Sequence, residues 1–123
     1  MANPYRRPAL GSALFYKDAF AALDWLEKAF GFERTMVITD QQGNLGHSEM
    51  RFGDGYIMIG GEWIDYVASP ASVGGKNTQS VHVHLAGDID AHCERARAAG
   101  AVILQEPAEK RHGVPRRARR PVA

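Results

Sequence analysis

The sequence predicts one α+β domain, in which two βαβββ modules form a curved mixed β-sheet with a cleft. Three observations support this fold class. A length of 123 residues suits one domain with a single core. A strand–Asp–helix–Gly–strand pattern recurs after about 70 residues. Glycine-containing turns separate short stretches of alternating polarity. The expected parts are module one at about 8–66, a linker at 67–79, module two at about 80–107 and a basic tail at 108–123.

The first helix is expected in the stretch AFAALDWLEKAF, between the strands ALFY and FERTMVIT. Leu23, Leu26 and Phe30 recur there at helical spacing, which predicts one apolar face. Asp18 stands at the N-cap position, and Gly31 follows the last turn as a typical C′ residue. The stretch therefore has a start signal, a stop signal and a buried side.

Two more strands, LGHSEMRF and YIMIGGEW, complete module one after the turn DQQGN. A three-residue GDG turn between them would set the cross-strand pairs Phe52–Tyr56 and Met50–Met58. The apolar side chains would then face the helix, and His47 and Glu49 would face the cleft.

Module two repeats the plan of module one. The stretch SVHVHLAG reads as a strand that runs into Asp88, a second N-cap residue. Ile89, Cys93 and Ala96 share one face of the helix that follows, and Gly100 ends that helix before the strand AVILQ. We expect Cys93 to be a small buried hydrophobe, not a nucleophile.

His82 and His84 project from the same side of the predicted strand, because side chains in a strand alternate between faces. Val81, Val83 and Leu85 suit the side that the helices cover. The histidines would then face the cleft. The alternative is that they are polar residues of a wet groove or of a subunit contact.

These patterns suggest a binding site in the cleft. The expected substrate-binding residues are Phe15, His47, Glu49, Trp63, His82 and His84. The imidazoles and the carboxylate could perform general acid–base chemistry, although no residue is assigned a catalytic role. The same cleft could bind a planar or cationic small molecule on the flat apolar surfaces of Phe15, Trp63 and Tyr66.

The chain resembles the vicinal oxygen chelate superfamily, which includes glyoxalase I, bleomycin-resistance proteins and extradiol dioxygenases. The resemblance covers roughly residues 8–113 and is carried by ALFYKDAFAALDWLEKAFGFE, GHSEMRFGDGYIMIGG and SPASVGGKNTQSVHVHLAGDIDAHCERARAAGA. It implies the paired-module fold, but several chemistries share that scaffold. It also implies that Met58 faces the cleft, which conflicts with the register expected from the turn.

The resemblance further implies metal ligands on the first and last strands of each module. The matching positions of module one are Gly11 or Ser12, and Met58. In module two the match is near Ser80, with His82 on the same face. At most one of these positions holds a ligand-type side chain, whereas a catalytic metal needs about three protein ligands. We therefore expect no metal; the alternative is a divalent ion such as Zn, Ni, Mn or Fe.

The preferred function is small-molecule binding in a metal-free cleft. The alternative is a divalent-metal-dependent lyase, isomerase or dioxygenase of the glyoxalase type. Family members usually end with further strands, which the Arg- and Pro-rich tail does not contain. We interpret the tail as a replacement for them, of the kind that a shifted reading frame produces. Because the shortened module leaves a sheet edge unpaired, we expect a homodimer, possibly with exchanged modules.

Charge and composition limit the other partners. Residues 1–109 carry 9 basic and 14 acidic side chains, and residues 110–123 carry six basic and no acidic ones. The tail alone suggests an interaction protein with a basic arm; an acidic body without a basic stripe makes nucleic acid an unexpected partner. No apolar run approaches the ~20 residues of a membrane helix, and no signal-peptide stretch is expected. With a lone cysteine, these features suit a cytoplasmic protein.

Overall fold

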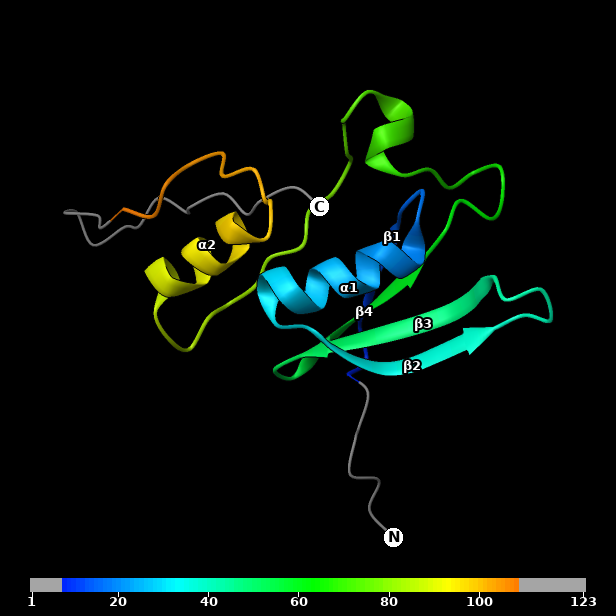
Figure 1. Ribbon diagram of the computed structural model, residues 1–123, viewed down its shortest axis with the longest axis horizontal. Helices are drawn as coiled ribbons and strands as arrows, with labels where there is room; N and C mark the ends of the chain where they lie inside the picture. The colour runs from blue at the N-terminus through cyan, green and yellow to red at the C-terminus, as the bar shows by residue number, and fades with distance from the viewer. Residues whose placement is uncertain (1–7, 109–123) are drawn as a thin grey trace, which may run out of the picture.

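The computed structural model describes residues 8–108, which form a four-stranded sheet and two α-helices (Figure 1). In chain order the elements are β1 (Ser12–Phe15), α1 (Ala19–Phe30), β2 (Glu33–Thr39), β3 (Leu45–Phe52), β4 (Gly55–Gly60), the short 3-10 helix η1 (Pro70–Val73) and α2 (Ile89–Ala98). The predicted α+β class with a curved mixed sheet is confirmed. No helix within residues 8–108 has the length and apolar character that a bilayer crossing requires.

The strands lie in the order β1-β4-β3-β2. β1 pairs with β4 in parallel, whereas β4 with β3 and β3 with β2 are antiparallel pairs. Among residues 8–108, therefore, β4 is the only strand beside β1, and β3 is the only strand beside β2. Both outer strands depend on the β3–β4 hairpin for their hydrogen-bonded partner.

The register of the β3–β4 hairpin differs by one residue from the sequence-based expectation. Gly53 has a left-handed backbone with φ of 57°, and Phe52 pairs with Gly55 across a two-residue loop. Glu49 consequently lies opposite Met58, while Met50 lies opposite Ile57. The expected Met50–Met58 pair is wrong. The correction removes the earlier conflict, because Glu49 and Met58 now share one face.

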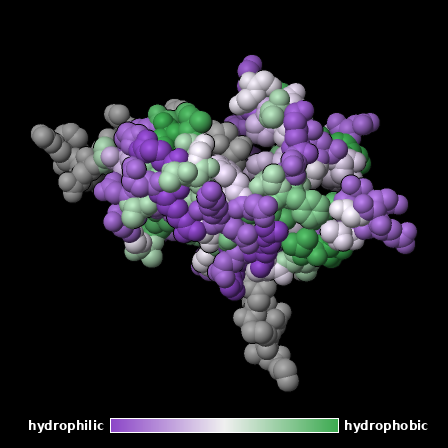
Figure 2. Space-filling model, viewed as in Figure 1, coloured by the Kyte–Doolittle hydropathy of each residue, from purple (hydrophilic) through white to green (hydrophobic). Residues whose placement is uncertain are grey.

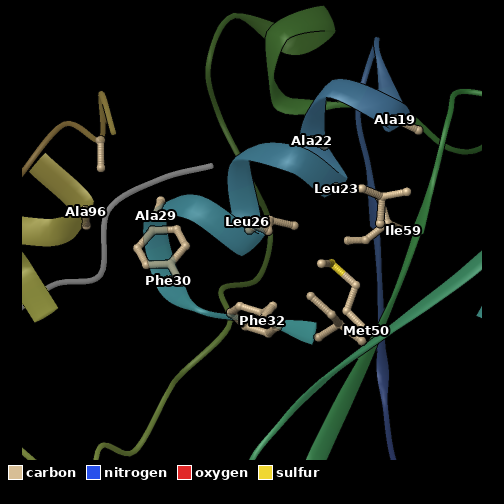
Figure 3. Packing of buried hydrophobic residues seen from close by; sticks show 12 residues of the cluster. Ala19, Ala22, Leu23, Leu26, Ala29, Phe30, Phe32, Met50, Ile59 and Ala96 are labelled. Carbon is tan, nitrogen blue, oxygen red and sulfur yellow. The ribbon is translucent and has the colours of Figure 1, made fainter. Parts of the chain in front are cut away.

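One face of the sheet is covered by α1. The Asp18 carboxylate accepts a hydrogen bond from the Ala21 backbone N–H at 3.1 Å, and Gly31 ends the helix with φ of 80°. Both predicted caps are confirmed. The apolar side of α1 packs on side chains of β3 and β4, as Figure 3 shows. The fully buried contacts there include Leu23, Met50 and Ile59.

The second helix packs chiefly on α1, beside which it lies in Figure 1. The Trp25 indole N–H donates to the Ala99 carbonyl at 2.8 Å. Arg95 donates to the carbonyls of Lys28 and Glu27 in the last turn of α1, where the Glu27 carbonyl also accepts the Gly31 backbone N–H. Side-chain hydrogen bonds therefore join the two helices.

Only part of the predicted apolar face of α2 is buried. Ala96 is fully buried and Cys93 is half-buried, but Ile89 is 37% exposed. The predicted burial of Cys93 is therefore only partial, and the face that the three residues share is fully buried only at Ala96.

The stretches 80–85 and 101–105 keep the side-chain alternation of strands without being strands. Val81 and Val83 pack against the core, whereas His82 and His84, which alternate with them, are exposed. Ala101 is likewise buried and Val102 is exposed. The predicted alternation is present, but the predicted strand pairing is absent from the described residues.

The missing pairing has a simple physical reason. The stretches 80–85 and 101–105 occupy the places, before and after a helix, that β1 and β2 occupy in the first half of the chain. β1 and β2 find their only neighbours in β4 and β3, which come later in the chain. The equivalent neighbours would follow residue 107, and the expected tail lies outside the described residues apart from Ala108.

Replacing Trp25 by Phe tests the contact between the helices. Trp25→Phe keeps an aromatic ring in the core but removes the N–H that Ala99 accepts. We expect the free energy of unfolding to fall by about 1 kcal/mol in urea denaturation followed by circular dichroism. Trp63→Phe is the matched control, because Trp63 is 70% exposed, and it should change stability by less than about 0.5 kcal/mol. Equal effects of the two substitutions would contradict the contact.

Candidate functional site

The face of the sheet opposite α1 contributes to a cavity of about 660 Å³. It lies where β1 and β4 end and β3 begins, and we call it the cleft cavity. Phe15, His47 and Trp63, three of the expected binding residues, line it together with Met58. Helix α1 contributes its N-terminal residues to the same cavity. The cavity therefore collects residues from the β1–α1 connection, from the start of β3 and from the segment that follows β4.

The position of the Phe15 ring depends on a glycine in the neighbouring strand. Phe15 pairs with Gly60 in the parallel β1–β4 ladder. A Cβ atom at Gly60 would lie 3.7 Å from the ring. The absence of a side chain at position 60 thus leaves the surface of β4 open to the ring, which can present a flat apolar wall.

His47 and Glu49 form a hydrogen-bonded pair on the cleft side of β3. Their Nε2 and Oε2 atoms are 2.8 Å apart, because residues two apart in a strand share a face. Glu49 is 2% exposed and stands opposite Met36 and Met58 in the neighbouring strands. The His47 side chain is 41% exposed. The buried carboxylate orients the imidazole, which leaves Nδ1 as the ring atom for a further hydrogen bond.

The loop after β4 brings Trp63 to the cavity. The carboxylate of Glu62 accepts hydrogen bonds from the backbone N–H of Ser69 at 2.8 Å and from its hydroxyl at 3.2 Å. Hydrogen bonds from Ser72 and Ser69 lower the pKa of the Glu62 carboxyl. The hydrogen bonds between Glu62 and Ser69 therefore join the two ends of the loop that carries Trp63. Tyr66, in the same loop, is 80% exposed and does not line the cavity.

The two histidines of module two lie apart from this group. His82 and His84 are exposed, and neither lines the cleft cavity. Within residues 8–108 the structure brings together Phe15, His47, Glu49 and Trp63 but not the pair from the stretch 80–85. Sequence reasoning missed Lys17, Phe20 and Glu62, which also line the cavity. Only their positions in the chain could have indicated this. Lys17 and Glu62 come just after β1 and β4, and Phe20 lies in the first turn of α1.

The side chains around the cleft cavity do not fit a metal centre. No group of three or more His, Cys, Asp or Glu in residues 8–108 is placed to hold a metal ion. His47 and Glu49 supply two such side chains, and they already bond to each other. A catalytic metal needs about three protein ligands. No reaction step is therefore assigned to a metal here.

A second, smaller cavity lies on the other side of the sheet. Its volume is about 160 Å³, and we call it the helix-side cavity. It is lined by Leu14 and Tyr16 of the β1 region, by Phe30 of α1 and by Val83, among others. Burial raises the pKa of the Tyr16 hydroxyl from 10.0 to about 12, because the charged phenolate would lose its hydration.

Comparison with known proteins places this arrangement among described folds. The model of the Glyoxalase/Bleomycin resistance protein/Dioxygenase superfamily matches residues 10–116. TioX from Micromonospora sp. ML1 has 27% identity and a TM-score of 0.58, over 82% of this chain and 79% of that one. UcmS2 has 16% identity and a TM-score of 0.59, over 87% and 85%. A glyoxalase/bleomycin resistance protein/dioxygenase from Nocardioides has 17% identity and a TM-score of 0.51, over 85% and 70%. No curated protein matches the sequence significantly.

The buried phenol of Tyr16 predicts a loss of stability at alkaline pH. A phenol whose pKa rises on folding makes its full contribution to the free energy of unfolding below pH 10. That contribution is lost as pH rises from 10.0 towards about 12. We expect urea unfolding of the wild type to weaken over this range more steeply than that of Tyr16→Phe, which has no phenol at this position. Parallel pH profiles of the two proteins would show that Tyr16 is not protected by burial.

Proposed function

Because the chain belongs to the Glyoxalase/Bleomycin resistance protein/Dioxygenase superfamily, we propose that it binds a small organic molecule in the cleft cavity. The cavity volume of about 660 Å³ carries the proposal. Ligand pockets of proteins measure about 300–1,000 Å³ and combine apolar walls with a few polar groups. Phe15 and Met58 supply apolar wall here, and His47 supplies a polar group.

The lining favours a planar ligand with a polar substituent. Phe15, Phe20 and Trp63 offer flat apolar surfaces, on which a ring system can stack. His47 is held by Glu49 and keeps Nδ1 for a hydrogen bond to the substituent. Lys17 and Glu62 add one charge of each sign at the same cavity. A planar bicyclic heteroaromatic molecule combines both requirements.

The proposal includes a metal-free site. Its support is that no three metal-type side chains among residues 8–108 are grouped to hold an ion: His47 and Glu49 bond to each other, and Asp18 and Glu62 line the cavity elsewhere. A divalent-metal-dependent lyase, isomerase or dioxygenase would need further ligands from outside residues 8–108. No contact among the described residues favours that alternative.

The proposal also includes a homodimer in the cytoplasm. Its support is the exposed apolar surface beside unpaired backbone. Figure 2 shows hydrophobic patches over the segment after α2 and near the β2–β3 end of the sheet. The exposed residues there include Val102, Leu104, Val37 and Ile38. A second copy would cover such surface, and an exchange of modules between the two copies would supply strand partners.

A panel of planar bicyclic heteroaromatic compounds, such as indole and benzimidazole, tests the binding function by NMR. We expect binders to shift the Met58 ε-methyl signal, because Met58 lines the cleft cavity. His47→Gln should weaken binding roughly threefold to tenfold through the lost hydrogen bond. His84→Gln is the matched control, because His84 is exposed and lies outside the cavity, and it should leave affinity unchanged.

Two results would contradict this proposal. If no compound of the panel shifted Met58, or if His84→Gln weakened binding as much as His47→Gln, the cleft cavity would not be the site. Elemental analysis of the same protein should find no stoichiometric Zn, Ni, Mn or Fe. A stoichiometric metal would contradict the metal-free site and leave the alternative activity.

A further inference from the structure

The helix-side cavity lies chiefly on the α1-covered face of the sheet, and the cleft cavity lies chiefly on the other face. Ile57 and Met58 are neighbours in β4 whose side chains point to opposite faces. Ile57 lines the helix-side cavity and Met58 lines the cleft cavity. Phe15 alone appears in the described lining of both. A ligand in one cavity would therefore change the NMR signals of different side chains than a ligand in the other cavity.

Aromatic rings form much of the wall of the helix-side cavity. Phe30 of α1 stacks on His92 of α2, with ring centroids 5.7 Å apart and an interplanar angle of 25°. Phe32 and Tyr16 contribute further rings. Figure 3 shows Phe30 at the end of α1 that lies beside α2, with Phe32 just after it in the chain. Rings prefer offset-stacked or edge-to-face partners, so this wall favours an aromatic guest.

The size of the cavity limits the guest to one ring. Its volume is about 160 Å³. An apolar protein cavity of roughly 150 Å³ is known to admit benzene. A bicyclic ligand of the kind proposed for the cleft cavity would exceed this space. The two cavities thus differ in the size of molecule that they can take.

The polar character of the lining further defines the guest. None of the described lining residues is an Asp, Glu, Lys or Arg, which favours a neutral molecule. The Tyr16 side chain is half-buried, and no hydrogen bond joins its hydroxyl to another of residues 8–108. Buried hydroxyl groups normally make hydrogen bonds, so a guest with a polar substituent would satisfy this one.

We propose that the helix-side cavity is a second ligand site, which takes a neutral single-ring aromatic molecule with a hydroxyl-type substituent. The ring packs between α1, β1 and the stretch 77–83, and the substituent bonds to Tyr16. This site goes beyond the proposed function, since it lies on the opposite face of the sheet from the cleft cavity and takes a smaller molecule.

Methyl NMR of the full chain titrated with phenol tests this proposal directly. We expect phenol to shift the methyl signals of Ile57 and Val83, which line the helix-side cavity, and to leave the Met58 ε-methyl unchanged. A shift of Met58 alone would place phenol in the cleft cavity; this would overturn the second site and leave the proposed function standing. Absence of any shift would also overturn it.

Two variants sharpen the test. Val81→Phe should fill the helix-side cavity and weaken phenol binding about tenfold or more. The matched control is Ala13→Phe, which adds the same ring to the cleft cavity and should leave phenol binding unchanged. The opposite order of effects would overturn the proposal.

Tyr16→Phe keeps the test decisive even if Val81→Phe fails to fold. It removes only the hydroxyl, so it should weaken phenol binding roughly threefold to tenfold. Binding of fluorobenzene, which has no hydroxyl group, should stay the same. Equal weakening of both probes, or of neither, would overturn the role of Tyr16 in the site.

Discussion

The packing of α1 against the β3–β4 hairpin is the interaction on which the rest of the structure depends. Leu23 of α1 and the hairpin residues Met50 and Ile59 are fully buried there. β1 and β2 each take their only strand neighbour from this hairpin. Helix α2 reaches the core through α1, to which Trp25 and Arg95 bond it. Loss of the hairpin face would therefore remove the support of every other element.

This packing also decides where binding can take place. Because side chains in a strand alternate, a face that buries Met50 and Ile57 commits Glu49 and Met58 to the other face. The carboxylate of Glu49 is buried on that face and holds His47 towards the cleft cavity. The helix-covered face keeps a smaller apolar space beside Tyr16. The alternation of side chains along β3 and β4 thus accounts for both cavities. The larger cavity, on one face, contains the polar side chain of His47, and the smaller cavity, on the other face, is lined by aromatic rings.

Much of the fold follows from local signals in the sequence, and the rest depends on distant pairing. Asp18 and Gly31 mark both ends of α1 through bonds that they make within a few residues. The hairpin register depends on the two-residue loop after Phe52, and a run of three turn residues does not reveal which of them pairs. His82 and His84 alternate as predicted, but a sheet that would carry them to the cleft needs strands from beyond residue 107. Phe15, His47 and Trp63 meet because their strands pair within the described residues.

The central claim is that Ile57 and Met58 face opposite sides of the sheet, one towards α1 and one towards the cleft cavity. It can be measured by cysteine labelling in a Cys93→Ser background, with Ile57→Cys and Met58→Cys compared under native conditions. Ile57 is 5% exposed in the core, whereas Met58 lines the cleft cavity. The thiol at position 58 should react readily with a two-ring thiol reagent that is too large for the helix-side cavity, and the thiol at position 57 should react only as fast as the protein unfolds. Equal rates, or faster labelling at position 57, would contradict the account.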